Sequence, residues 1–224
     1  EFTRNLLMVM AVLTICAGAF GALIKGNIRR LFSYLIVCHI GFMLGGIALF
    51  TKVALMGVTF YLLHDIMVKT NMFLIAGLIR QLRGTMDMSR LGGLYKEYPK
   101  ISLLIAIVLF SLVGIPPLSG FWPKIYLFQE SFAQHQYFFV GALIFGSFVT
   151  LYVIANMWAK VFWQDAPDPH ILEDKFAPLP LYRKILLVLP ITILAAVTLY
   201  IGFNAEAIIV VTERIASELI DTKP

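Results

Sequence analysis

Charged residues are scarce in this chain. Only 14% of its 224 residues are Asp, Glu, Lys or Arg, whereas 60% are hydrophobic. The mean hydropathy is +0.86. A soluble domain usually carries about 25% charged residues. The composition therefore excludes a water-soluble single domain and predicts an all-α integral membrane protein, whose spans each need about 20 apolar residues.

Motifs for cofactors and nucleotides are also lacking. The two cysteines, Cys16 and Cys38, lie inside apolar runs, so we expect neither a disulfide framework nor a cysteine-rich metal site. The sequence has no G-x-x-x-x-G-K-[ST], no G-x-G-x-x-G after a strand, and no Cys or His spacing suited to haem or iron–sulfur ligation. We therefore expect a transporter component without cofactor or metal, and not an enzyme. The net charge of +5 does not call for nucleic acid, because basic residues set orientation in membrane proteins.

The apolar runs predict six membrane-spanning helices followed by an interfacial helix. The spans are expected at residues 6–24, 31–50, 53–79, 101–132, 137–162 and 185–203, and the interfacial helix at 205–220. We divide the chain into a six-helix transmembrane portion, 1–203, and an amphipathic tail, 204–224. The chain begins with Glu1 and has no visible signal peptide, so we expect its start to be internal to a longer chain.

Basic residues alternate along the predicted spans. Three loops are basic, and they hold Lys25, Arg29 and Arg30; Arg80, Arg83, Arg90, Lys96 and Lys100; and Lys160, Lys175, Arg183 and Lys184. The other two loops hold only Lys52 or no basic residue at all. Because Lys and Arg accumulate on the cytoplasmic side, both ends of the six-span portion are expected to face away from the cytoplasm.

Three ionisable residues lie inside the third predicted span. His64, Asp65 and Lys69 occur in the run YLLHDIMVKTNMF, and charge at membrane depth is costly. Asp65 and Lys69 are four residues apart, so they share one helix face and can pair. The pair could be a structural tether between helices. It could instead be a protonatable relay, with His64 adding a group that titrates near neutral pH.

Lys124 follows a stretch that cannot form one unbroken helix. Pro116 and Pro117 each remove a backbone donor, and Gly120 follows closely in IPPLSGFWPK. Non-helical backbone at membrane depth is tolerated only where it is buried in protein or lines a polar cavity. Broken helices recur near ion sites of transporters. We therefore place Lys124 on a proton path beside a broken-helix hinge, the alternative being a simple kink with a snorkelling lysine.

Other polar residues in the spans are weaker candidates. His39 is expected inside the bundle, where it extends the polar axis. Glu130 is interpreted as a solvated residue at a helix end. Asn71 could line water or bridge two helices, and the sequence does not decide between these roles.

The chain resembles a known transporter family in three segments. The runs HDIMVKTNMFLIAGLI, LGGLYKEYPK and SLVGIPPLSGFWPKI are similar to the Mrp-type multisubunit sodium/proton antiporters, in particular to their D-type subunits. These subunits are related to the proton-pumping membrane subunits of respiratory complex I. The resemblance covers nearly the whole chain and is most specific in the third and fourth spans.

The resemblance implies a fold and roles for individual residues. Subunits of this family have about fourteen helices, including two inverted five-helix repeats with one broken helix each, and the six spans here resemble the second repeat plus the final helix. Lys124 matches the lysine on the second broken helix, Lys69 the lysine of the central axis, and His64 a histidine beside it. Complex I relatives often have His or Ala at the position of Asp65, so the His64–Asp65 pair favours the antiporter.

The implied function is proton movement coupled to outward sodium transport elsewhere in the assembly. The implied partners are the other antiporter subunits, of the A, B, C, E, F and G types, with Na+, H+ and the bilayer of a prokaryotic plasma membrane. The first repeat of the family has no counterpart in this sequence, so these residues alone are not expected to transport ions. Two alternatives stay open: a membrane subunit of complex I or of a membrane-bound hydrogenase, and a structural scaffold with inactive polar residues.

Overall fold

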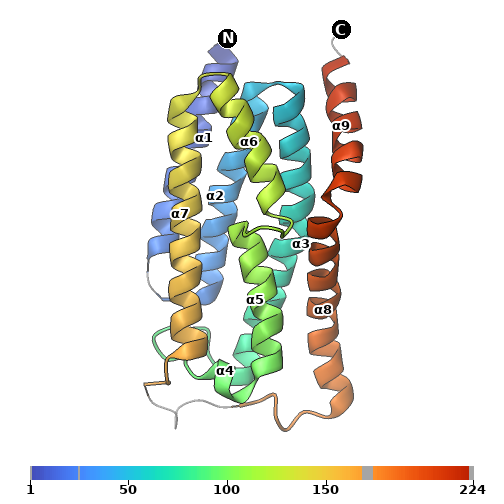
Figure 1. The fold of residues 1–224 in the computed structure, drawn as a ribbon. Coiled ribbons are helices and arrows are strands. Elements are labelled where there is room, and N and C mark those ends of the chain that lie inside the picture. Colours follow the sequence, from blue (N-terminus) through green and yellow to red (C-terminus); the bar gives the residue numbers. More distant parts are fainter. Residues whose placement is uncertain (1, 25, 168–173, 222–224) are drawn as a thin grey trace.

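The computed structural model describes residues 2–24, 26–167 and 174–221 and is helical throughout these ranges, apart from its loops (Figure 1). Its helices are α1 (Phe2–Leu23), α2 (Ile28–Leu49), α3 (Lys52–Arg83), α4 (Leu94–Glu97), α5 (Pro99–Val113), α6 (Phe121–Ala133), α7 (Tyr137–Trp158), the π-helical turn η1 (Ala159–Trp163), α8 (Leu181–Phe203) and α9 (Ala205–Asp221). Glu1, Lys25, residues 168–173 of the last basic loop and residues 222–224 of the predicted tail lie outside the described residues. The prediction of an all-α membrane protein is confirmed.

Five helices in the described ranges are long and apolar enough to cross a bilayer, and they are α1, α2, α3, α7 with η1, and α8. The predicted fourth span is divided between α5, of 15 residues, and α6, of 13 residues. Each is shorter than the roughly 20 residues that a single crossing needs. The sequence predicts six spans with the fourth one broken at Pro116 and Pro117; the described residues contain five helices of spanning length, and the sixth crossing stays a prediction.

The interruption between α5 and α6 has a local cause. Gly114 closes α5 with a φ of +87°, a left-handed conformation that glycine adopts without strain. Pro116 and Pro117 follow, and neither has a backbone N–H with which to extend the helix. Figure 1 shows the two half-helices meeting at about mid-height of the bundle, beside α3.

Helix α3 is the central element of the bundle. It has 32 residues and contacts α2, α5, α6, α8 and α9. Helices α1 and α2 pack closely against each other, because glycine allows their backbones to approach. A Cβ atom on Gly18 would lie 2.3 Å from the backbone nitrogen of Cys38.

The three predicted basic loops lie at one end of the bundle. Asn27, between α1 and α2, forms an isolated β-bridge with Asp87, which follows α3. The backbone N–H of Gly93 donates to the carbonyl of Gln164, beyond η1, at 2.7 Å. The grouping of these loops on one side agrees with the alternation of basic residues in the sequence.

The last helix differs from its predicted placement. The sequence predicts that it lies at the membrane interface, but α9 runs lengthwise along the N-terminal half of α3 (Figure 1). Ala205 packs in one cluster with Phe60, and Ala216 packs in another with Leu55 and Met56. The apolar faces of α3 and α9 therefore pack against each other. An ion pair between Lys52 and Glu213, at 2.8 Å, also joins the two helices. Amphipathicity predicts an apolar face on such a helix but not the surface that covers it.

Candidate functional site

A buried charge cluster joins α2 and α3. The Asp65 carboxylate lies 3.1 Å from Nδ1 of His39 and 3.7 Å from Nζ of Lys69. The residues are almost inaccessible, with exposed fractions of 0% for His39, 6% for Asp65 and 7% for Lys69. An ionised carboxylate can only accept hydrogen bonds, so Nδ1 of His39 carries the proton in this arrangement. The sequence predicted the Asp65–Lys69 pair, and the structure adds His39 as the second partner of the carboxylate.

His64 and Asp65 are adjacent in the chain but contact different residues. Its Nδ1 lies 2.8 Å from the hydroxyl of Ser119, and that hydroxyl lies 3.0 Å from the hydroxyl of Ser111. All three residues are buried. Ser111 belongs to α5 and Ser119 to the segment between α5 and α6. His64 is therefore linked to the helix break rather than to the charge cluster on α2.

Lys124 lies on the other side of the same break. Its Nζ donates to the carbonyl oxygen of Val113, the last residue of α5, at 2.7 Å. The carbonyls of a helix C-terminus lack intrahelical partners and carry partial negative charge, so they attract a cation. The ammonium group also lies 6.0 Å from the centre of the Phe42 ring. Lys124 is buried, with 7% of its surface exposed, so it does not snorkel to the outer surface.

Several polar atoms in this region have no hydrogen-bond partner within the described part of the chain. They include Nε2 of His39, Nε2 of His64, Nζ of Lys69 and the hydroxyl of Tyr61. The Tyr61 ring lies edge-on between the two histidines, 5.6 Å from His39 and 6.0 Å from His64. Buried polar groups that lack protein partners are uncommon and mark strained or catalytic sites, or positions where ordered water or an ion binds. This arrangement can bind and release protons at several closely spaced groups.

The structure brings the predicted site residues into one region around α3. Lys124, Lys69, His64, Asp65 and His39 are all buried, although His64 and Asp65 contact different elements. The hinge residues Pro116, Pro117 and Gly120 lie in the interruption, where the two prolines are exposed and Gly120 is buried. Within the described ranges, no cluster of three or more His, Cys, Asp or Glu residues could hold a metal ion.

Three residues of the site were missed by sequence reasoning. Ser111, Ser119 and Tyr61 are common residue types in membrane helices, and nothing in their spacing indicates their partners. The run PPLSG did mark the neighbourhood of Ser119. Asn71 has the bridging role that the sequence left undecided, because its Nδ2 donates to the Ile191 carbonyl of α8 at 3.1 Å.

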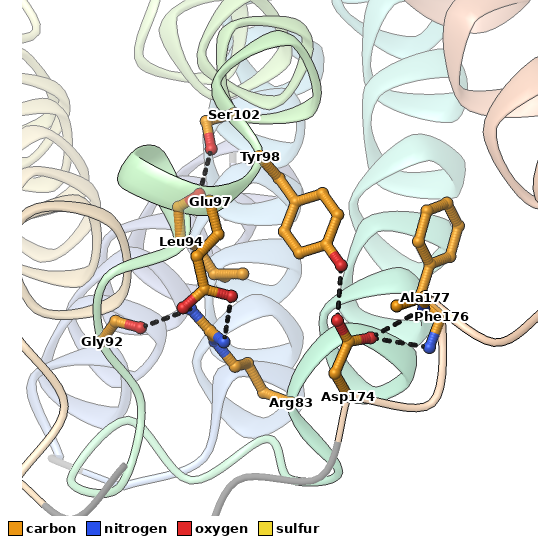
Figure 2. A network of polar contacts seen from close by, with 9 residues as sticks. All are labelled: Arg83, Gly92, Leu94, Glu97, Tyr98, Ser102, Asp174, Phe176 and Ala177. Atoms are coloured by element: carbon orange, nitrogen blue, oxygen red, sulfur yellow. Dashed lines mark hydrogen bonds and ion pairs between the residues drawn. The ribbon is translucent and has the colours of Figure 1, made fainter.

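A second polar network lies at the basic end of the bundle (Figure 2). Arg83, the last residue of α3, donates to both carboxylate oxygens of Glu97 at 2.8 and 2.9 Å and to the Gly92 carbonyl at 3.0 Å. Two parallel bonds between a guanidinium and a carboxylate fix both groups in orientation. Nearby, the hydroxyl of Tyr98 donates to Asp174. The network therefore ties α3 and the start of α5 to the segment before α8.

Asp174 and Tyr98 have shifted pKa values because of this contact. Burial alone would raise the pKa of Asp174, but bonds from the Tyr98 hydroxyl and from the backbone N–H groups of Ala177 and Phe176 lower it below its ordinary value. Burial, together with the hydrogen bond to Asp174, raises the pKa of Tyr98 to about 12. Both groups therefore hold the protonation states that the bond requires near neutral pH.

Comparisons with known proteins agree with this architecture. The model of the NADH:quinone oxidoreductase/Mrp antiporter transmembrane family matches residues 1–150. The chain is 32% identical over 220 residues to the D-type subunit of the Na(+)/H(+) antiporter of Alkalihalophilus pseudofirmus, a match that covers 98% of this chain and 43% of the relative. It is 30% identical over 221 residues to the corresponding Na(+)/H(+) antiporter protein of Bacillus subtilis, with coverage of 98% and 43%.

Solved structures show the same fold. A chain of the Mrp complex from Dietzia sp. DQ12-45-1b is similar, with a TM-score of 0.84, 25% identity, and coverage of 97% of this chain and 47% of that chain. A chain of the membrane-bound sulfane sulfur reductase, an archaeal respiratory membrane complex, has a TM-score of 0.80 at 22% identity, with coverage of 97% and 42%, and shares the fold alone. The chain thus spans less than half the length of these relatives.

Proposed function

Since the chain belongs to the NADH:quinone oxidoreductase/Mrp antiporter transmembrane family and is a homologue of the D-type subunits of Mrp antiporters, we propose that it forms the proton-translocating part of a multisubunit Na+/H+ antiporter. Protonation changes at Lys69 and Lys124, joined by His64 and water, carry protons laterally and to one membrane face. This movement is coupled to outward Na+ transport elsewhere in the assembly.

The observation that carries this proposal is the environment of Lys124. Its ammonium group is buried and held by the Val113 carbonyl at the end of α5. A movement at the break between α5 and α6 that takes Val113 away from Lys124 removes this partner and favours loss of the proton. Lys69 differs from Lys124 in its partner, which is the carboxylate of Asp65 and not a backbone carbonyl. Asp65 also contacts His39, so the two basic groups share one carboxylate.

The topology follows from the same proposal. Helices α5 and α6 together form one broken span, so that six crossings place the three basic loops in the cytoplasm and both chain ends outside a prokaryotic plasma membrane. Further antiporter subunits, of the A, B, C, E, F and G types, and the bilayer are the partners. The matched lysines support a role in transport, whereas a pure scaffold has no use for buried charge at this cost.

A redox-driven complex is the second candidate function. The matching family model names NADH:quinone oxidoreductase together with the Mrp antiporters. In that case redox chemistry in other chains drives proton movement through the same buried residues. Flavin or iron–sulfur subunits that co-purify with the full-length protein would favour this candidate over sodium/proton exchange.

The test is the sodium-induced pH change in everted vesicles from a host without its own antiporters. The full-length subunit is expressed with its operon partners, as wild type, as Lys124→Ala and as Lys100→Ala. Lys100 is an exposed lysine at the other end of α5, so this matched control removes the same charge away from the break. We expect Lys124→Ala to abolish the signal without loss of assembly and Lys100→Ala to retain it.

Two results would decide against the proposal. Retained exchange in assembled Lys124→Ala would remove the central residue from the path. A wild type that does not respond to Na+, in a native membrane where a redox donor drives proton pumping, would place the protein with the respiratory complexes instead.

A further inference from the structure

A pair of buried serines connects His64 to the helix break. The Ser119 hydroxyl lies between Nδ1 of His64, at 2.8 Å, and the Ser111 hydroxyl, at 3.0 Å. The two serines have exposed fractions of only 0% for Ser111 and 1% for Ser119. The mechanism proposed above uses His64 but assigns no role to these two hydroxyls.

Two arrangements of this chain of groups use the proton of Ser119 within it. Each hydroxyl has one proton to donate, and a neutral imidazole has one N–H. In the first arrangement, Nδ1–H of His64 donates to Ser119, and Ser119 donates to Ser111. In the second, Ser111 donates to Ser119, Ser119 donates to Nδ1, and the ring proton is on Nε2.

The two arrangements differ at the second ring nitrogen of His64, Nε2. Nε2 of His64 has no hydrogen-bond partner among the described residues. Gly120 lies directly against Nε2, since a Cβ atom on Gly120 would be 3.0 Å from this nitrogen. Nε2 is therefore an acceptor in the first arrangement and a donor in the second, while the heavy atoms keep their places.

We infer that Ser119 is a positioning residue that sets which ring nitrogen of His64 carries the proton, and so whether Nε2 can accept a proton or donate one. The inference rests on the proposed function, because it assigns a direction to proton movement past His64. The neutral ring carries one N–H in both arrangements, so its charge is the same in each.

The same segment also positions Lys124. Ser111 lies two residues before Val113, whose carbonyl holds the lysine. A displacement of the α5 end therefore changes the Ser111–Ser119 bond and the Lys124–Val113 bond together. This geometry couples the tautomer of His64 to the state of Lys124 through one piece of backbone.

The experiment uses the full-length subunit in its complex, with four variants. Ser119→Ala removes the hydroxyl, Ser119→Thr keeps it, and Ser111→Ala removes its partner. The matched control is Ser102→Ala, which deletes another buried hydroxyl of α5, one that donates to the Leu94 carbonyl far from His64. The readouts are the sodium-dependent exchange rate per assembled complex and the ¹⁵N NMR shifts of His64, assigned by difference from His64→Gln.

We expect Ser119→Ala to slow exchange by roughly three- to tenfold, as loss of one neutral hydrogen bond predicts, and to change the His64 tautomer pattern. Ser119→Thr restores both readouts, and Ser102→Ala changes neither. The NMR result for Ser111→Ala, an altered tautomer ratio, keeps the test decisive if threonine does not fit the site.

Unchanged His64 shifts in Ser119→Ala and Ser111→Ala would overturn the inference, as would altered shifts with unchanged exchange. Failure of the proposed function is distinguishable, because wild type itself would then give no sodium-dependent signal while the NMR comparison still reports on Ser119.

Discussion

Two polar regions of the molecule, a partly exposed one at the basic end and a buried one in the middle, are satisfied to different degrees by protein groups. At the basic end, the two terminal nitrogens of Arg83 have three acceptors and both oxygens of Asp174 are occupied, although Nε of Arg83 has no partner in the described ranges. In the middle of the bundle, Lys69 shares one carboxylate oxygen with His39, and Nζ of Lys69 has no hydrogen-bond partner in the described ranges. Protein groups therefore satisfy the network at the basic end more fully than the cluster in the middle of the bundle.

The difference indicates different tasks. A network in which most groups have protein partners fixes the orientation of its members. A group without a protein partner keeps a donor or an acceptor available for water or for a neighbouring group. We interpret the network of Figure 2 as an anchor for three helix ends, and the region around His39, Asp65, Lys69, His64 and Lys124 as the part that changes state.

Removal of the Lys69 side chain should have the largest effect on exchange while leaving assembly intact. We expect Lys69→Ala to lower the sodium-dependent exchange rate by at least about tenfold, equivalent to ~1.4 kcal/mol of barrier, while the complex still assembles. The reason is that a relay group cannot be replaced by a methyl group. The measurement is exchange in everted vesicles, normalised to the amount of assembled complex.

A mild effect of Lys69→Ala would instead assign the Asp65–Lys69 pair to the anchoring class and remove the contrast between the two regions. Lys52→Ala is the matched control on the same helix. Lys52 is the first residue of α3, is half-exposed, and pairs with Glu213 of α9.

Loss of Arg83 should have the opposite profile. We expect Arg83→Ala to destabilise the protein by about 2–3 kcal/mol, because it removes charge-assisted bonds from a buried site. Exchange per assembled complex should change little. Arg83→Lys should recover only part of the stability, since an ammonium group cannot form the paired bonds to Glu97. The measurement is thermal unfolding in detergent; a variant that unfolds like wild type but exchanges slowly would contradict the assignment.

The next largest expected loss of stability comes from a change in packing beside the same network. A Cβ atom on Gly92 would lie 2.4 Å from the backbone nitrogen of Ala166. We expect Gly92→Ala to destabilise by about 1–2 kcal/mol, since backbone cannot give way easily. Gly77→Ala is the control, because a Cβ atom there meets nothing within 4 Å. Equal melting temperatures for the two variants would show that the loop around Gly92 does not anchor the helix ends.

The sequence predicted the charged members of the buried cluster around α3 better than their partners. Spacing alone placed Asp65 and Lys69 on one face, and hydropathy alone placed Lys124 at depth. The Val113 carbonyl could not be predicted, because it becomes available only where α5 ends relative to Lys124. Ser119 was missed for a similar reason, since its partner is 55 residues away in the chain.

The sequence was least informative about the anchor and about α9. Arg83 was interpreted as a loop residue that sets orientation, whereas it is buried and paired with Glu97. The apolar face of α9 was predicted but not its cover, α3. In both cases the local pattern is compatible with exposure, and only tertiary contact decides.

The smallest effect is expected at Tyr98, where pH sharpens the comparison. Tyr98→Phe removes the bond to Asp174 but keeps the edge-on contact with Phe176. Both groups are only half-buried, so water can replace the lost bond and we expect a loss of only about 0.5–1 kcal/mol. The Asp174 pKa is lowered, so its contribution is present above the ordinary value of about 3.9 and is lost as pH falls through the lowered one. The Tyr98 pKa is raised to about 12, so its contribution is present below the ordinary tyrosine value and is lost as pH rises through the raised one. The difference in melting temperature between wild type and Tyr98→Phe should therefore stay constant from about pH 5 to about pH 9. A difference that disappears within this window would mean that the anchor titrates too, and the distinction between the two regions would fail.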